Sequence, residues 1–265
     1  MFLLKKFRTF CIFAYLFCIV HIISLMFKFF DVSLALSAES GFARFGTGHI
    51  IWLGALIAFC ALTALIYRRA SPTARRWLRL AVSGAAVIIE VWRGALFFFA
   101  GEYTLGRLPL HLRTMAVYLS FFHAVRGGGF IAQLLYAFAM PGALAALICP
   151  DWSVYPMRSF LAASSFMLHI LLVSYPLMLV FSRELTPDIR QGAKMLGVLL
   201  SVAVPIYIFD KLTGTNYMFL NYPAPASPLE WFAFLGRPWY ILGYIPLLFT
   251  VWGIIYLPFI KRRGQ

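Results

Sequence analysis

Apolar stretches of the chain contain two histidines, which could act as bases, and a threonine, which could act as a nucleophile. His111 and Thr114 belong to the segment Leu108–Thr114, and His169 belongs to a later stretch. A neutral imidazole can accept the proton of a hydroxyl group, and that oxygen can then attack an ester carbonyl. We therefore predict His169, His111 and Thr114 as catalytic residues.

Four further polar residues in these apolar stretches could bind a charged substrate. They are Glu90, Arg93, Arg113 and Ser165, and Ser165 shares a helical face with His169 at i, i+4. Arginine binds phosphate or carboxylate through paired hydrogen bonds, and ionisable groups within a membrane mark a functional site by default. We predict substrate binding; the alternative is a structural salt bridge in which Glu90 only neutralises Arg93 or Arg113.

Helix geometry predicts one cavity for these residues. At ~1.5 Å of rise per residue, His111 lies ~5 Å and His169 ~18 Å below the outer ends of their helices. His111, Thr114 and Tyr118 follow i, i+3 and i+7, so we expect them on one stripe, with Arg113 on another face. The cavity is expected to open toward the outer leaflet or the outside. His21, His49 and His123 are interpreted as structural or interfacial.

The composition is that of an integral membrane protein. Hydrophobic residues make up 62% of the 265 residues, against roughly 45–50% in soluble domains. The pattern predicts an all-α, polytopic transmembrane bundle of eight spans of ~20 residues each. We expect spans at residues 10–30, 48–67, 80–100, 108–124, 130–148, 157–181, 192–209 and 239–260. A cleaved signal peptide is the alternative for the first span.

The distribution of the net charge of +14 is typical of a membrane protein and does not indicate nucleic-acid binding. Most lysines and arginines fall in alternate inter-span segments and at both termini, which is the positive-inside pattern. We therefore predict both termini in the cytoplasm, no nucleic-acid partner, and attraction to anionic lipid headgroups. The predicted location is the bacterial inner membrane.

The sequence predicts no metal or other cofactor. It contains no HExxH motif and no CxxC pair, and Cys11, Cys18 and Cys60 lie in apolar runs. Residues 1–42 are predicted to form an additional N-terminal helix with an external linker, and residues 43–265 a seven-helix core. The loop at 210–238 is rich in proline, asparagine and aromatic residues, so we expect it at the membrane interface.

Several short motifs, in this order, resemble the YwaF-type bacterial integral membrane proteins, which are related to transmembrane protein 164. They are LPLHL at 108–112, Cys149-Pro150-Asp151, His169, NYMFL at 216–220 and Pro238-Trp239-Tyr240. The resemblance covers residues 43–259. It implies a seven-helix fold shared with lipid-handling enzymes.

The resemblance also implies a chemistry. The eukaryotic relative is described as an acyltransferase that acts on ether phospholipids with a Cys/His pair, and related Thr/His proteins hydrolyse fatty-acid esters. The family histidine corresponds to His169. The cysteine that usually follows LPLHL is Arg113 here, which argues against cysteine-based transfer. Thr114 is the substitute nucleophile, although its side chain is rotated about 100° around the helix.

Two functions follow from the sequence. The first is an acyltransferase or ester hydrolase that acts on a lipid in the outer half of the bilayer. The second is a non-catalytic protein that binds a lipid or solute, as a transporter or as a subunit of a membrane complex. Membrane lipids are the expected partners in both, and a protein partner or homo-oligomer is left open.

Overall fold

The computed structural model describes residues 25–37, 41–225 and 227–260. Every regular element in this part of the chain is helical, which confirms the all-α class. The predicted span at residues 10–30 lies largely outside the described residues; residues 25–30 are helical. Within the described part, six helical segments are long and apolar enough to cross a membrane: Thr47–Arg69, Pro72–Phe99, Gly129–Val154, Phe160–Phe181, Ile189–Thr213 and Trp239–Ile260.

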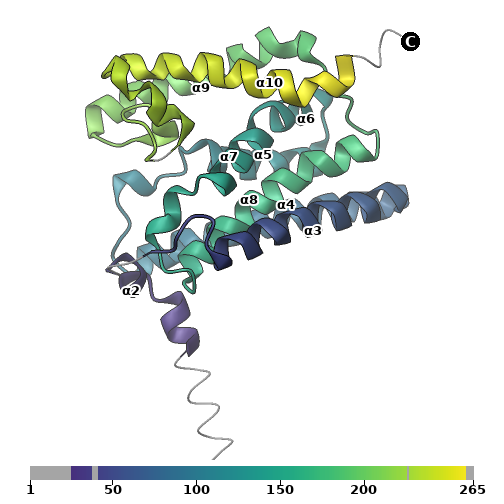
Figure 1. Cartoon of the computed structure of the whole chain (residues 1–265). Helices are drawn as coiled ribbons and strands as arrows, with labels where there is room; N and C mark the ends of the chain where they lie inside the picture. The colour runs from purple at the N-terminus through teal and green to yellow at the C-terminus, as the bar shows by residue number, and fades with distance from the viewer. Residues whose placement is uncertain (1–24, 38–40, 226, 261–265) are drawn as a thin grey trace, which may run out of the picture.

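Helix α8 (Phe160–Phe181) lies at the centre of the bundle (Figure 1). The Ser159 hydroxyl caps its first turn by accepting a hydrogen bond from the backbone N–H of Ala162. It packs against α3 (Thr47–Arg69), α4 (Pro72–Phe99), α5 (Leu112–Arg126) and α7 (Met140–Ile148). In its most apolar stretch, 72% of the residues are buried.

Helix α4 (Pro72–Phe99) begins eight residues before the predicted start of the third span at residue 80. Ser71 accepts a hydrogen bond from the backbone of Ala74, and Pro72 occupies the first turn, where its missing N–H costs nothing. The arginines that were expected in a loop therefore lie on the first turns of α4. Only Ala70 and Ser71 separate α3 from α4.

Helix α5 (Leu112–Arg126) begins four residues later than predicted. Pro109 lies in a turn in which the Leu110 N–H donates to the Leu108 carbonyl at 2.8 Å, so it does not open the helix. His111 is the extended residue that precedes the first turn. With 15 residues, α5 is shorter than the ~20 residues that a full crossing needs.

The predicted span at 130–148 contains a change of helical pitch. Helix α6 (Gly129–Leu134) continues through the π-helical segment η2 (Leu135–Ala139) into α7 (Met140–Ile148). A π-turn frees a backbone carbonyl from the α-helical pattern. The carbonyl of Ala137 instead accepts a hydrogen bond from the indole of Trp252 at 3.0 Å.

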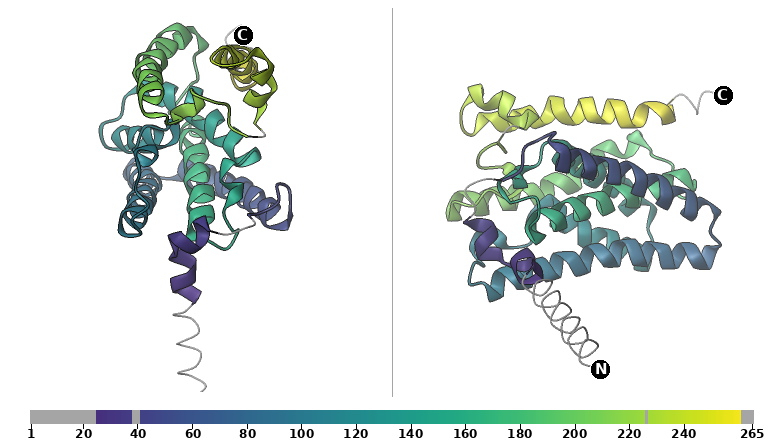
Figure 2. Two further views of the ribbon diagram at one scale, coloured as in Figure 1. Left: turned by 90° about the vertical axis from the view of Figure 1, so that its left-hand side faces the viewer. Right: turned by 60° about the horizontal axis from the view of Figure 1, so that its bottom comes forward.

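Helices α9 (Gly192–Thr213) and α10 (Tyr244–Ile260) lie along the side of the bundle opposite α3 and α4 (Figures 1 and 2). In their most apolar stretches, only 17% and 22% of the residues are buried. The segment between them contains three short 3-10 helices, η5 (Tyr217–Phe219), η6 (Pro228–Leu235) and η7 (Trp239–Gly243). A further short helix, α2 (Val32–Leu36), contacts α8.

Candidate functional site

Glu90 on α4 pairs with two adjacent residues in the first turn of α5. Its Oε1 atom accepts hydrogen bonds from the Thr114 hydroxyl at 2.7 Å and from Arg113 Nη2 at 3.3 Å. The other carboxylate oxygen and Arg113 Nε are buried with no hydrogen-bond partner among the described residues. The charge pairing that the sequence offered as an alternative is therefore present, with Arg113 as the cation.

Arg93 turns away from Glu90 and binds α8. Its Nη1 atom donates to the hydroxyls of Ser165 at 2.5 Å and Ser164 at 3.3 Å, and to the carbonyl of Leu161 at 3.2 Å. The side chain is 9% exposed. All three acceptors are uncharged, so these hydrogen bonds do not neutralise the charge of Arg93.

His169 has one ring nitrogen, Nε2, without a hydrogen-bond partner among the residues that the structure describes. Its Nδ1 lies 2.7 Å from the main-chain carbonyl of Ser165, and a carbonyl can only accept, so Nδ1 carries the proton. The Nε2 lone pair is then available to accept a proton from another group. The ring is stacked on Trp152 with centroids 4.6 Å apart and planes 20° from parallel, which holds its orientation.

His49 shows the opposite arrangement. Its Nδ1 accepts the backbone N–H of Phe45 at 2.8 Å, and its Nε2 donates to the carbonyl of Leu147 at 2.8 Å. Both nitrogens are occupied, so His49 joins α3 to the end of α7 and has no capacity for proton transfer. His123 shares a 2.8 Å hydrogen bond with the Tyr175 hydroxyl.

His111 lies beside the loop that follows α9. Its ring meets Tyr217 edge-on at 4.9 Å between centroids and lies 6.0 Å from Phe219. The sequence predicted that His111, Thr114 and Tyr118 share one helical stripe. This prediction is wrong, because His111 precedes the helix. Thr114 is buried, whereas Tyr118 is exposed.

A fully buried carboxylate holds Tyr217 in place. Asp210 Oδ1 accepts the backbone N–H of Tyr217 at 3.0 Å and the hydroxyl of Thr215 at 2.6 Å. The Tyr217 hydroxyl donates to the carbonyl of Leu105. Burial raises the pKa of the Tyr217 phenol, which keeps this donor protonated.

The same loop carries two residues with unusual backbone angles. Met218 and Phe219 have φ of 52° and 55°, a region that non-glycine residues rarely adopt. The hydroxyl of Tyr244 donates to the Met218 carbonyl at 2.7 Å, and that of Tyr240 donates to the Phe219 carbonyl at 2.8 Å. The loop that we expected at the membrane interface thus packs tightly against the start of α5.

A groove of about 380 Å³ lies between α4 and the turn that precedes α5. Its polar lining comes from Glu90, Tyr103, Arg107 and Tyr118, and its apolar wall includes the exposed Phe98. Further lining residues are Val91, Gly94, Ala95, Phe99 and Pro109. The Arg107 guanidinium lies 3.7 Å from the centre of the Phe97 ring.

The structure brings the predicted site residues into one region of the bundle but not into one hydrogen-bonded group. The charges of Arg93 and Arg113 act on both His111 and His169. No hydrogen bond links His169 to the hydroxyl of Thr114 or Ser165 within the described part of the chain. The Thr114 hydroxyl donates to Glu90, and the Ser165 hydroxyl donates to the Leu161 carbonyl at 2.8 Å.

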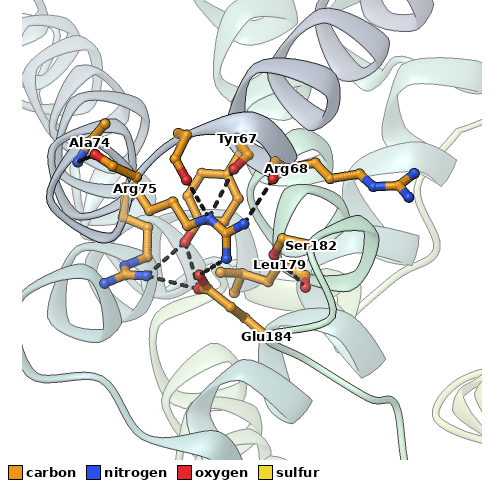
Figure 3. Close-up of polar contacts among 10 residues, drawn as sticks. Tyr67, Arg68, Ala74, Arg75, Leu179, Ser182 and Glu184 are labelled. Carbon is orange, nitrogen blue, oxygen red and sulfur yellow. Dashed lines mark hydrogen bonds and ion pairs between the residues drawn. The ribbon is translucent and has the colours of Figure 1, made fainter.

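Sequence reasoning missed a second polar cluster, at the opposite end of α4 and α8 (Figure 3). Glu184 accepts hydrogen bonds from the Tyr67 hydroxyl at 2.6 Å, from Arg75 at 3.0 Å and from Arg79 at 2.9 Å. Arg75 also donates to carbonyls at the end of α3, including that of Arg68 at 2.8 Å. The signal in the sequence was an acidic residue directly after Arg183, in one of the basic segments.

Asp210 and Tyr217 were also missed as contributors to the site. They belong to the stretch around the NYMFL motif, which the sequence marked only by its composition and resemblance. The carboxylate at the end of α9 and the aromatic residue seven positions later meet because Gly214 adopts a left-handed conformation (φ 73°) at the end of the helix.

Comparison with known protein families supports the resemblance. The TMEM164 family matches residues 44–256, a range that contains every candidate residue named above. Comparisons with curated proteins and with solved structures gave no match. The match spans most of the chain, and the chain belongs to the TMEM164 family of membrane proteins.

Proposed function

We propose that this protein binds a membrane phospholipid in the groove beside α4, that Arg107, which lines the groove, holds its phosphate group, and that the nearby Arg93 and Arg113 add positive charge. The observation that carries the proposal is the charge balance. Arg93 lies close enough to Arg107 and Arg113 to be repelled by both, and the nearby Glu90 supplies one negative charge. Unbalanced charge is costly in a membrane protein interior, so an anionic ligand would stabilise this arrangement.

The shape of the groove supports a lipid rather than a small polar solute. Arg107 and Tyr103 line one part of it, and the exposed apolar side chains Val91, Phe98 and Phe99 line the other. A phospholipid has the same division between a charged head and an apolar chain. The volume of about 380 Å³ lies within the usual range for a ligand site.

The proposed topology has eight crossings with both termini in the cytoplasm of a bacterial inner membrane. Helix α5 makes one of them together with the turn that precedes it, because its 15 residues alone are too few. Its support is that the basic segments meet at one end of the bundle. Arg75 and Arg79 reach Glu184, and Lys194 lies 4.4 Å from the ring of Phe130. The groove lies at the other end of α4, which this topology puts in the outer half of the bilayer.

Lipid retention by purified protein tests the binding proposal. Arg107→Gln and Arg113→Gln should each weaken binding of phosphatidylglycerol roughly tenfold, since a charge-assisted hydrogen bond contributes about 1.5–3 kcal/mol. Diacylglycerol with the same chains lacks the phosphate and should bind both variants as it binds the wild type. Arg69→Gln, at the far end of α3, is the matched control. Unchanged phosphatidylglycerol binding in both variants would refute the proposal.

A second candidate function is acyl transfer or ester hydrolysis on the bound lipid, and the 2.7 Å contact between Thr114 and Glu90 favours it. In this scheme Glu90 takes the hydroxyl proton as Thr114 Oγ1 attacks an ester carbonyl. The ester C–O bond then breaks, the acyl group stays on Thr114, and Glu90 gives the proton that it took to the leaving alkoxide. Water or a second alcohol then attacks the acyl carbonyl, His169 Nε2 accepts its proton, and that proton passes to Thr114 Oγ1 as the acyl group leaves.

Turnover of a phospholipid with a labelled acyl chain tests this second function. Thr114→Ala should abolish turnover, Thr114→Ser should retain part of it, and His169→Ala should reduce it. Thr63→Ala is the matched control, because the Thr63 hydroxyl bonds carbonyls of its own helix, those of Phe59 at 2.7 Å and Cys60 at 3.2 Å. Equal turnover in Thr114→Ala and wild type would exclude the catalytic scheme and leave the binding proposal untouched.

A further inference from the structure

A second, smaller cavity lies between α9 and the core of the bundle. It has a volume of about 100 Å³ and is separated from the groove by helix α5. We call it the α9 slot. Its lining residues are Leu112, Met115, Ala116 and Leu119 of α5; Leu134, Leu135, Phe138 and Ala139 of α6 and η2; Val198, Leu199 and Val202 of α9; and Met218.

The lining of the α9 slot excludes water as a stable occupant. Every lining side chain within the described part of the chain is apolar. A buried water molecule needs two to four polar partners, so apolar cavities stay dry. The occupant that this surface favours is a hydrocarbon.

The dimensions of the slot narrow the choice of occupant further. From Leu112 to Leu119 it extends along α5 for about 10 Å at 1.5 Å of rise per residue, parallel to the helices. A helix from a partner protein has a diameter of about 10–12 Å, far too wide for a cavity of this volume and length. One extended acyl chain, which also runs along the bilayer normal, has a suitable shape.

The position of the slot connects it to the candidate site. Leu112 directly follows His111, and Met218 lies between the two aromatic residues that contact the His111 ring. The slot therefore begins beside His111 and leads away from it into the bundle. Its outer wall is α9, of which only 17% is buried in the most apolar stretch, so a chain can enter sideways from the bilayer.

We propose that the α9 slot holds one acyl chain of a membrane phospholipid, with the polar part of that lipid at the His111 end. This inference rests on the proposed function in that it takes a lipid as the ligand, and it adds a chain-binding subsite on the other side of α5 from the groove.

Photocrosslinking in nanodiscs tests the proposal. The full chain is reconstituted with a phosphatidylglycerol that carries a diazirine in the middle of one acyl chain, and labelled peptides are identified by mass spectrometry. We expect labelling of the α5 stretch 112–119 and the α9 stretch 198–202. Ala116→Trp fills the slot and should reduce this labelling roughly tenfold, the factor that burial of about two methylene groups supplies.

Two further variants make the result decisive. Val202→Phe fills the slot from the α9 side, so a folding defect of Ala116→Trp alone does not decide the outcome. Leu200→Trp adds the same bulk on an exposed position of α9 and should leave labelling unchanged. Slot labelling that is no stronger than labelling of the exposed face of α3, or that persists in both filled variants, would overturn the proposal.

The arginine variants separate this inference from the proposed function. If Arg107→Gln and Arg113→Gln leave phosphatidylglycerol binding intact while slot labelling depends on Ala116 and Val202, the headgroup site is wrong and the chain site stands. If headgroup binding depends on the arginines but the slot is not labelled, the chain site is wrong and the headgroup site stands.

Discussion

Helix α8 and the pair α9 and α10 are similarly apolar, but they pack very differently. In the most apolar stretch of α8, 72% of the residues are buried, against 17% and 22% in α9 and α10. Apolarity brings all three helices into the membrane, where lipid chains solvate a leucine as well as another helix does. Something other than apolarity must therefore bring α8 into the centre of the bundle.

Small side chains are one part of the difference. Residues 162–165 of α8 read Ala-Ala-Ser-Ser, and the chain comes close to its neighbours along this stretch because little bulk stands between the backbones. Helix α10 instead carries large aliphatic and aromatic residues along most of its length. Such a surface packs against lipid as readily as against protein.

Charged hydrogen bonds at both ends are the other part. Arg93 binds the first turns of α8, and Glu184, just beyond its last turn, binds Arg75 and Arg79. Helix α10 is linked to η2 by two neutral hydrogen bonds, from Trp252 and to the Ile255 carbonyl. The tightly packed region holds the candidate site, and the loosely packed region borders the α9 slot.

The largest expected effect on stability comes from truncating a phenylalanine to alanine, which is compared between α8 and α10. Phe166 on α8 is fully buried and stacks on Trp52 at 5.0 Å between centroids, with Trp152 against its edge. Phe166→Ala should lower the free energy of unfolding by about 3 kcal/mol through the cavity it leaves. Phe249→Ala, at an exposed position of α10, should change it by less than about 0.5 kcal/mol. Unfolding in mixed micelles followed by circular dichroism measures both; equal losses would contradict the comparison.

Asp210→Ala tests how the loose region is joined to the site. The change removes the acceptor of the Tyr217 N–H and the Thr215 hydroxyl in a fully buried position, which should cost about 2 kcal/mol. Limited proteolysis should then cut the loop at residues 214–222 faster than in wild type. Asp210→Asn keeps one carbonyl oxygen and should lose less; if it loses as much as the alanine variant, hydrogen bonding is not the cause.

The membrane-spanning helices could be predicted from the sequence because apolar runs and breaks are local signals. The Cys149-Pro150 break ends α7 as expected, and α8 lies within the predicted span 157–181. The start of α5 could not be predicted in the same way. Pro109 suits both a helix start and a turn, and the contacts of the following residues with the loop after α9 decide between them.

The sequence predicted which residues form the site but not which of them bind one another. The sequence placed Glu90, Arg93 and Arg113 together, and helical spacing made Glu90 and Arg93 the nearest neighbours. In the structure Arg93 instead reaches Ser165, because α8 passes that face of α4. Which partner a long arginine side chain takes depends on helix packing, and helix packing is not encoded in the periodicity of one segment.

Glu184→Gln weakens the link at the basic end of α8. A neutral amide accepts at one oxygen only and presents an N–H group to the arginines, so Arg75 and Arg79 lose part of their compensation. Because the Glu184 side chain is 30% exposed, we expect a loss of about 1–2 kcal/mol. Glu102→Gln in the loop after α4 is the control and should be near neutral. A loss that does not diminish in high salt would argue against an electrostatic origin.

The smallest expected effect is on the attachment of α10. Trp252→Phe keeps an aromatic ring but removes the hydrogen bond to the Ala137 carbonyl, at a cost of about 1 kcal/mol. Because α10 is otherwise loosely held, this loss should appear as local opening rather than global unfolding. Hydrogen exchange should accelerate in α10 and in η2 while α8 keeps its protection. Faster exchange in α8 as well would mean that the two regions unfold as one unit, and the contrast in burial would then carry no difference in stability.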